Sequence, residues 1–529
     1  MFEYGPLPPL MFLSMVAFML YGFPVAFSLG AVGLTFGLIG IATDHFAPTF
    51  LNALPHRVFG IVSNDILLAI PFFTFMGAIL ERAGLAEDLL EGTGKLFGRI
   101  PGGLAYAVIL VGAILGAMTG TVAASVLTMG VISLPIMLRY GYSQKLATGV
   151  IAASGTIAQL IPPSLVLIIL ADQLGKPVGQ MYLGAFGPAG MQVLLFLLFV
   201  LAVSLVRPNL VPPLPPEVRG DLTFALVLRV LWGIVPPLVL IFLVLGTIFL
   251  GLATPTESGA LGVVGALVLA AMNRRLSWPL VSQAMATTAR ITAMVVFILI
   301  GASIFTLVFQ GMDGGRWIEH LLSHLPGGQL GFLIFVNVFI FFLAFFLDFF
   351  EIAFIVVPLL APVAQSLGID LIWFGVLLCV NMQTAFMHPP FGFALFYLRS
   401  ITPPEVRTSQ IYLGALPWLG MQLALVVIVI FWPGLVTGNL SQAPRINLDD
   451  VRIEVPGFAP GGGLGAPPGL GAPPGLGAPP GLAAPGAALQ PGAGPGQPAL
   501  GQPSFGQPPA AAPAPGALGQ PPALLAPPP

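Results

Sequence analysis

Polar side chains interrupt two long apolar stretches of this sequence near their middles. The first stretch contains Met118-Thr119-Gly120-Thr121, and the second contains Asp348-Phe349-Phe350-Glu351. Ionisable residues inside apolar segments are costly and usually functional. Hydroxyl and carbonyl oxygens suit a small hard cation such as Na⁺, and a carboxylate suits a cation or a proton. No nucleophile-elbow, Walker or zinc-protease motif accompanies these residues, so they indicate ion binding more than covalent catalysis.

Consecutive prolines break two further apolar stretches, at Pro162-Pro163 and at Pro389-Pro390. Proline lacks an N–H and disfavours helix in the preceding residue, so nearby carbonyls lose their helical partners. In hydrocarbon, such a break persists only where protein, water or a ligand satisfies the freed groups. We therefore expect the two polar tips and the two Pro-Pro breaks to converge on one binding site.

The candidate binding residues in these segments fall into two groups, those that could bind Na⁺ and those that could bind a carboxylate substrate. Oxygen ligands for Na⁺ are predicted at Thr119, Thr121, Gly155, Thr156 and Thr384. Half-helix N-termini carry positive partial charge, so a carboxylate substrate is predicted to bind at the tips and breaks. The residues predicted there are Thr119, Gly120, Pro162, Pro163, Asp348, Glu351, His388 and Pro389.

Each candidate also has a structural alternative. A threonine in a membrane helix usually bonds its own main chain, and a proline pair can simply kink a helix. His388 is equally explained as a packed core histidine. Gly112, Gly116 and Gly120 are spaced by four residues, which is typical of close packing between the arms of a hairpin.

The elements that must position these residues are membrane helices. Of 529 residues, 57% are hydrophobic and 7% are charged, with a mean hydropathy of +0.98. A soluble domain has roughly a quarter charged residues, so a soluble enzyme is excluded. The net charge of -2 indicates no nucleic-acid partner, and the single Cys379 excludes an internal disulfide. The sequence predicts an all-α polytopic membrane protein embedded in a lipid bilayer.

Two apolar segments, residues 101–138 and 327–366, are too long for one crossing and contain no polar loop. Roughly 20 residues span the hydrocarbon core, and each half of these segments is shorter than that. Lys95 and Arg139 flank the first segment, so both of its ends are expected on the cytoplasmic side. Few basic residues flank the second, whose ends are expected outside. Both segments are therefore predicted to be re-entrant hairpins that enter from opposite faces.

The two halves of the chain repeat. Tyr182-Leu183-Gly184-Ala185 recurs 230 residues later as Tyr412-Leu413-Gly414-Ala415. The predicted division is residues 1–210 for the first repeat, 211–236 for the linker and the start of the second half, and 237–440 for the second repeat. Each half reads helix, broken hairpin, Pro-Pro-interrupted helix and final helix. Because the hairpins enter from opposite faces, the repeat is inverted, which is typical of secondary transporters with a site near the midplane.

Residues 441–529 form a tail rich in proline and glycine. The repeat Gly-Leu-Gly-Ala-Pro-Pro runs through residues 463–480, and no charged residue follows Glu454. Such a composition cannot bury enough apolar area to offset its chain entropy, so the tail is predicted to be disordered. The topology above places it on the periplasmic side, and we expect it to have no part in the chemistry.

At its motifs the chain resembles the large membrane subunit of tripartite ATP-independent periplasmic (TRAP) transporters, over about residues 5–440. The resemblance implies an elevator-type importer of the bacterial inner membrane, driven by Na⁺ and without a cofactor. It also implies a separate small four-helix membrane subunit and a periplasmic binding protein that delivers a small organic acid. The motifs that carry it are Gly141-Tyr142, Gly155-Thr156, Ile161-Pro162-Pro163-Ser164, Thr254-Pro255-Thr256-Glu257 and Pro389-Pro390-Phe391-Gly392.

The tips depart from the common family pattern. The first tip often reads Ser-Gly-Ser where this chain has Thr119-Gly120-Thr121, which keeps both hydroxyls. Asp348, Glu351 and His388 resemble the branch linked to 2-oxo acids, lactate, mannitol or chloroaromatic acids. These three residues also support an alternative in which H⁺ is the coupling ion. A membrane-embedded enzyme is a further alternative, which would need a polar catalytic cluster outside the tips.

Overall fold

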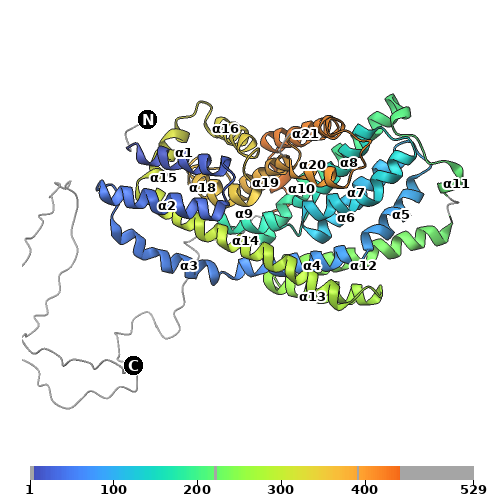
Figure 1. The fold of residues 1–529 in the computed structure, drawn as a ribbon, viewed down its shortest axis with the longest axis horizontal. Coiled ribbons are helices and arrows are strands. Elements are labelled where there is room, and N and C mark those ends of the chain that lie inside the picture. Colours follow the sequence, from blue (N-terminus) through green and yellow to red (C-terminus); the bar gives the residue numbers. More distant parts are fainter. Residues whose placement is uncertain (1–4, 220–222, 390–391, 441–529) are drawn as a thin grey trace, which may run out of the picture. The chain divides into compact units, whose positions relative to one another are not determined.

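The computed structural model describes residues 5–219, 223–389 and 392–440 (Figure 1). Within these ranges the chain is helical and has no strand. Eight helices are long and apolar enough to cross a membrane, or ten if two bent pairs each count as one span. The prediction of an all-α polytopic membrane protein is therefore confirmed. The predicted disordered tail, 441–529, lies outside the described residues.

The helices of the two halves follow one another in the same order. In the first half they are α1 (Leu7–Leu20), α2 (Val25–Ala42), η1 (Pro48–Ala53), α3 (Leu54–Val62), α4 (Asp65–Arg82), α5 (Leu85–Phe97), α6 (Gly103–Thr119), α7 (Val122–Arg139), α8 (Gln144–Thr156), η2 (Ile157–Gln159), α9 (Leu165–Gln173), α10 (Val178–Val206), η3 (Pro208–Leu210) and α11 (Pro216–Arg219). In the second half they are α12 (Phe224–Phe249), α13 (Pro255–Met272), α14 (Trp278–Gly311), α15 (Gly314–Ser323), α16 (Gly328–Leu343), α17 (Phe349–Glu351), η4 (Ile352–Val356), α18 (Val357–Ser366), α19 (Leu371–Met382), η5 (Gln383–Phe386), α20 (Phe393–Ile401), α21 (Thr408–Phe431) and α22 (Gly434–Thr437).

Contacts between the halves are reciprocal. Helix α14 packs along α2, and α4 packs along α13 (Figure 1). In the order of elements, α2 corresponds to α13 and α4 corresponds to α14. The contact of α2 with α14 is therefore equivalent to the contact of α13 with α4, with the two halves exchanged. The pairs α8 with α21 and α10 with α19 repeat this arrangement further along the chain. Such reciprocity is what a two-fold relation between two copies produces. The boundaries at residues 210 and 236 stay a prediction.

The first hairpin consists of α6 and α7, which pack on each other and are joined at Gly120 and Thr121. Gly120 ends α6 with φ +60°, a conformation that glycine adopts without strain. A Cβ on Gly116 would lie 2.7 Å from Ala158 Cα, and one on Gly112 would lie 2.8 Å from Ser154 Cβ. The closest approach that these glycines permit is therefore to α8 and η2. Gly112 also approaches the other hairpin arm, since its Cβ would lie 2.9 Å from Met129 Cε of α7, so the expected packing between the arms is present as well.

The second hairpin is built differently from the first. Helix α16 leads to Asp348, and the return arm consists of α17, the π-helical segment η4 and α18. Both arms contact α15 and α19, with α16 mainly on α19 and α18 mainly on α15. The return arm differs from that of the first hairpin because it begins with the three-residue α17 and the π-helical η4. How deeply either hairpin enters the bilayer stays a prediction.

The motif Thr254-Pro255-Thr256-Glu257 has a structural role in this fold. Thr254 caps α13, and the Glu257 carboxylate accepts a hydrogen bond from the Thr254 N–H at 2.8 Å, which completes a capping box. Thr256 Oγ1 donates to the carbonyl of Asp65, the first residue of α4, at 2.5 Å. The motif therefore fixes the start of α13 against the start of α4.

Candidate functional site

A cavity of about 260 Å³ lies where both hairpin tips meet both Pro-Pro breaks. Each of these four segments contributes wall residues, and α14 closes one side. The lining residues are Gly120, Thr121, Val122 and Ala123 from the first tip, Gln159, Leu165 and Val166 from the first break, Asp348, Phe349 and Phe350 from the second tip, Phe386, Phe393 and Tyr397 from the second break, and Ile291 and Met294 from α14. In the structure, segments from the two polar tips and from the two Pro-Pro breaks therefore lie around one cavity.

Four helical segments begin at this cavity. The first residues of α7, α9, α17 and α20 all line it, and they are Val122, Leu165, Phe349 and Phe393. The first N–H groups of a helix have no partner within the helix and carry positive partial charge. A cavity at which four helical segments start is therefore suited to an anion.

The four helix starts differ in how they are capped. Ser164 accepts from the Leu167 N–H at the start of α9, and the acidic pair of the second tip caps α17. No side chain caps α7 at Thr121 or α20 at Gly392. The main-chain N–H groups at the start of α7, which begins in the first tip, are therefore available to a ligand in the cavity.

Asp348 and Glu351 form a capping box at the second tip. Asp348 Oδ1 accepts from the Phe349 N–H at 2.7 Å, and Glu351 Oε2 accepts from the Asp348 N–H at 3.0 Å. Asp348 lines the cavity, whereas Glu351 holds the main chain behind it. Asp348 is the one charged side chain among the lining residues, and no cationic side chain accompanies it. An anion in this cavity would therefore need a cation to compensate the charge of Asp348.

The predicted cation ligands lie around the first tip and the ends of α8 and α19. Thr119 Oγ1 donates to Leu115 O at 2.9 Å and lies 3.1 Å from Ser125 Oγ. Thr156 Oγ1 donates to Ala153 O at 2.8 Å, and Thr384 Oγ1 donates to Asn381 O at 2.7 Å. Each hydroxyl thus bonds its own helix, as in the structural alternative, and retains lone pairs for a cation.

Further contacts join the predicted residues of the first half. A Cβ on Gly155 would lie 3.0 Å from the Val126 N, so the end of α8 packs on the first turns of α7. A Cβ on Gly120 would lie 3.4 Å from Pro163 O, so the first tip rests on the first break. Thr121 lines the cavity itself. In the described ranges no group of three or more His, Cys, Asp or Glu side chains could hold a metal ion, so any cation there relies on other oxygen ligands.

His388 does not line the cavity. It is fully buried, and the rings of Phe341 and Phe345 lie 4.3 Å from its ring between centroids. Those two phenylalanines lie on α16 and just after it, so His388 packs against the first arm of the second hairpin. Pro389 is partly buried beside it. Pro390 and Phe391 lie outside the described residues.

Sequence reasoning missed the aromatic side of the cavity, which we call the aromatic wall: Phe349, Phe350, Phe386 and Phe393. The ring centroids of neighbouring members lie 4.0 Å, 6.1 Å and 6.4 Å apart along the series from Phe350 to Phe393. Gln159 and the α14 residues Ile291 and Met294 were missed as well. Phenylalanine is common throughout the chain, so no local pattern distinguishes these rings. A glutamine next to a Pro-Pro break was the available signal.

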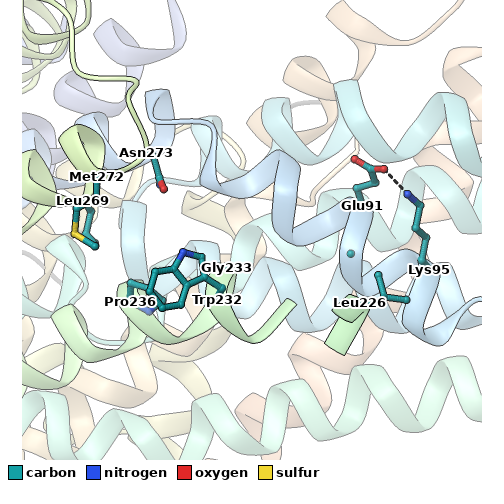
Figure 2. Close-up of a pocket in the computed structure, with 10 residues that line it drawn as sticks. Glu91, Lys95, Leu226, Trp232, Gly233, Pro236, Leu269, Met272 and Asn273 are labelled. Carbon is teal, nitrogen blue, oxygen red and sulfur yellow. Dashed lines mark hydrogen bonds and ion pairs between the residues drawn. The ribbon is translucent and has the colours of Figure 1, made fainter. Parts of the chain in front are cut away.

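A larger cavity, of about 360 Å³, lies between α5, α12 and α13 (Figure 2). Figure 2 shows the ion pair of Glu91 and Lys95, at 2.5 Å, on one side and Trp232 on another. None of the predicted site residues lines it. Its Trp232 side chain is 68% exposed, which is typical of a surface hollow. We therefore assign the candidate site to the smaller cavity.

Apolar spans, interrupted helices and a cavity built from both halves of the chain are typical of a polytopic membrane transporter. The family comparison identifies its kind. Residues 12–435 match the model of the family described as "Tripartite ATP-independent periplasmic transporter, DctM component". The chain belongs to this family and is a large TRAP transporter permease, not an enzyme.

Individual relatives agree with the family match. The C4-dicarboxylate TRAP transporter large permease protein DctM of Pseudomonas aeruginosa is 30% identical over 73% of this chain and 89% of its own length. The isethionate TRAP transporter permease protein DctMQ of Oleidesulfovibrio alaskensis is 26% identical over 81% of this chain and 65% of its own. The crystal structure of the Alcanivorax borkumensis YdaH transporter has a similar fold, with a TM-score of 0.54 and 16% identity, over 81% of this chain and 98% of that one.

Proposed function

We propose that this permease couples Na⁺ entry to the import of a small organic acid across the bacterial inner membrane. A periplasmic binding protein delivers the acid, and a separate small four-helix subunit completes the membrane part. The observation that carries the proposal is the cavity at which four helices begin beside one partly buried carboxylate. This arrangement attracts an anion and requires a cation at the same time.

Coupling follows from the charge of the cavity. The N–H groups at the start of α7 attract the substrate carboxylate, while Asp348 repels it across the cavity. Na⁺ bound by oxygens of the first tip and the end of α8 offsets that repulsion and orders the tip. Substrate binding then costs less, which is positive coupling between two sites.

Relatives and packing support the rest of the proposal. The two relatives described above are named for anions, a C4-dicarboxylate and isethionate. Both hairpins and both broken helices contribute to the cavity, so they can move as one body with the substrate inside. The remaining helices, among them the reciprocal pairs of α2 with α14 and α4 with α13, supply a scaffold for an elevator movement.

The first test is the thermal stability of the purified chain in detergent, titrated with NaCl or KCl at constant ionic strength. A ligand that binds only the folded state, at about 100 times its Kd, adds roughly 2.7 kcal/mol to the free energy of unfolding. We expect Na⁺ to raise the melting temperature and K⁺ to leave it unchanged. The double variant Thr119→Val with Thr121→Val should lose the Na⁺ effect.

The matched control is Thr148→Val. Thr148 is buried and bonds the carbonyl of Gln144 in its own helix at 2.8 Å, as Thr119 bonds Leu115, but it lies near the start of α8, outside the first tip. The control should keep the Na⁺ effect. Equal stabilisation by both salts would contradict Na⁺ coupling. A pH-dependent stability that disappears in Asp348→Asn would then indicate H⁺ as the coupling ion.

A further inference from the structure

Gln159 is the polar residue of the first break that lines the cavity. It lies in η2, between the end of α8 and Pro162, and is 1% exposed. Neither the nitrogen nor the oxygen of its carboxamide has a hydrogen-bond partner. Buried polar groups are normally paired, so an unpaired carboxamide at a cavity indicates a ligand that pairs it.

The main chain at Gln159 is held firmly. Its carbonyl accepts a hydrogen bond from Ser164 Oγ in the same break and one from Cys379 Sγ of α19 at 3.6 Å. These two contacts fix the main chain of the break to itself and to the other half of the protein. The unpaired carboxamide therefore belongs to an ordered segment.

The cavity has three chemically distinct parts. The uncapped start of α7, at Val122 and Ala123, attracts a carboxylate. The first tip rests on the first break, as the 3.4 Å approach of a Gly120 Cβ to Pro163 O shows, and Gln159 of that break lines the same cavity as the start of α7. The aromatic wall supplies an apolar surface for the rest of the molecule. A volume of about 260 Å³ admits a small organic molecule, since one water occupies roughly 30 Å³ in the liquid.

We propose that Gln159 is a specificity-determining residue, and that it hydrogen-bonds a hydroxyl or keto group beside the carboxylate of a monocarboxylate whose apolar body packs on the aromatic wall. This inference rests on the proposed function and names its substrate class. A second carboxylate would lie against phenylalanine rings without a cationic partner, which is unfavourable. The cavity therefore selects against dicarboxylates, in contrast to the substrate in the name of the Pseudomonas aeruginosa relative.

The test is a binding comparison with three probes on the full-length chain in detergent with NaCl. The probes are 2-hydroxy-4-methylpentanoate, 4-methylpentanoate, which lacks only the hydroxyl, and succinate. We expect the hydroxy acid to bind at least about tenfold more tightly than its deoxy analogue, and succinate to bind most weakly. In Gln159→Leu the ratio of the two monocarboxylate Kd values should fall to within about twofold.

Two further variants separate specificity from folding. Gln192→Leu removes a buried carboxamide that is also unpaired but does not line the cavity, and it should keep the wild-type ratio. Gln159→Asn keeps the chemical group on a shorter side chain and should give an intermediate ratio.

The proposal is overturned by an unchanged ratio in Gln159→Leu, by tighter binding of succinate than of both monocarboxylates, or by no binding of any monocarboxylate. Na⁺-specific stabilisation, measured on the same samples without any acid, tests the proposed function separately. If Na⁺ stabilises the protein and the ratio does not follow Gln159, only the specificity inference fails. If Na⁺ has no effect and the ratio does follow Gln159, the Na⁺ coupling fails alone.

Discussion

Asp348 combines two tasks in one side chain. One carboxylate oxygen caps the helix that starts the second tip, and the residue is also the charged member of the cavity lining. Glu351 contributes only to the cap, through the N–H of Asp348. Glu351 is therefore a positioning residue and Asp348 a binding residue, although the sequence alone does not distinguish their roles.

These two tasks can be separated by substitution. Asparagine caps a helix about as well as aspartate, so Asp348→Asn should leave the melting temperature of the ligand-free protein close to that of the wild type. The same variant lacks the charge and should lose the Na⁺-dependent rise. Asp348→Leu should lose both, because leucine cannot cap. Thermal unfolding with and without NaCl measures both effects, and a full Na⁺ response in Asp348→Asn would contradict the role of the charge.

Two of the four polar side chains that line the cavity, Thr121 and Asp348, could be predicted from the sequence, because a hydroxyl or carboxylate inside an apolar segment is conspicuous; Gln159 and Tyr397 were not predicted. Thr121, Gly120 and Asp348 line the cavity as expected. His388 was equally conspicuous, yet it packs between Phe341 and Phe345. A sequence gives the cost of burying a polar residue but not the direction of its side chain. The aromatic wall could not be predicted, because apolar residues are expected throughout a membrane protein and nothing in the sequence distinguishes the phenylalanines that line a cavity.

At the scale of elements, the first hairpin and the first broken helix form one packed unit. Gly112 and Gly116 bring α6 against α8 and η2, so the tip and the break are held at a fixed distance. A spacing of four residues shows that the glycines share a helix face, but it does not show which neighbour that face meets. This is why the break points were predictable while the packing partner was not.

An alanine at position 116 tests this unit. Its Cβ would lie 2.7 Å from Ala158 Cα and 3.0 Å from Ala158 N, both main-chain atoms that cannot move alone. We expect Gly116→Ala to destabilise the protein by about 1–3 kcal/mol and to weaken Na⁺ and acid binding together. The control is Gly190→Ala in α10, where no atom lies within 4 Å, and it should be neutral or slightly stabilising. Equal melting temperatures for the two variants would contradict the packing argument.

At the scale of the whole molecule, everything that builds the cavity lies before residue 440. The family match ends at residue 435, and the described residues, which end at residue 440, belong to one compact unit. The sequence indicated a boundary close to this point, because the long apolar stretches end there and the composition rich in proline and glycine follows.

We therefore expect a chain that stops after Arg445 to behave like the full-length protein in Na⁺ and acid binding. The measurement is the same pair of titrations on truncated and full-length protein purified in parallel. A truncated chain that is folded but has lost Na⁺ stabilisation would show that the tail takes part in function.

The reciprocal contacts between the halves join helices that are synthesised at very different times. Helix α4 ends at Arg82, and its partner α13 begins only at Pro255. At about 5–20 residues per second, a ribosome needs roughly 10 to 35 s to synthesise the intervening chain. During that time, the face of α4 that will meet α13 has only lipid or the insertion machinery to contact. The first half of the chain therefore enters the membrane as an unfinished structure, and the synthesis of α13 and α14 completes the packing of helices inserted long before them.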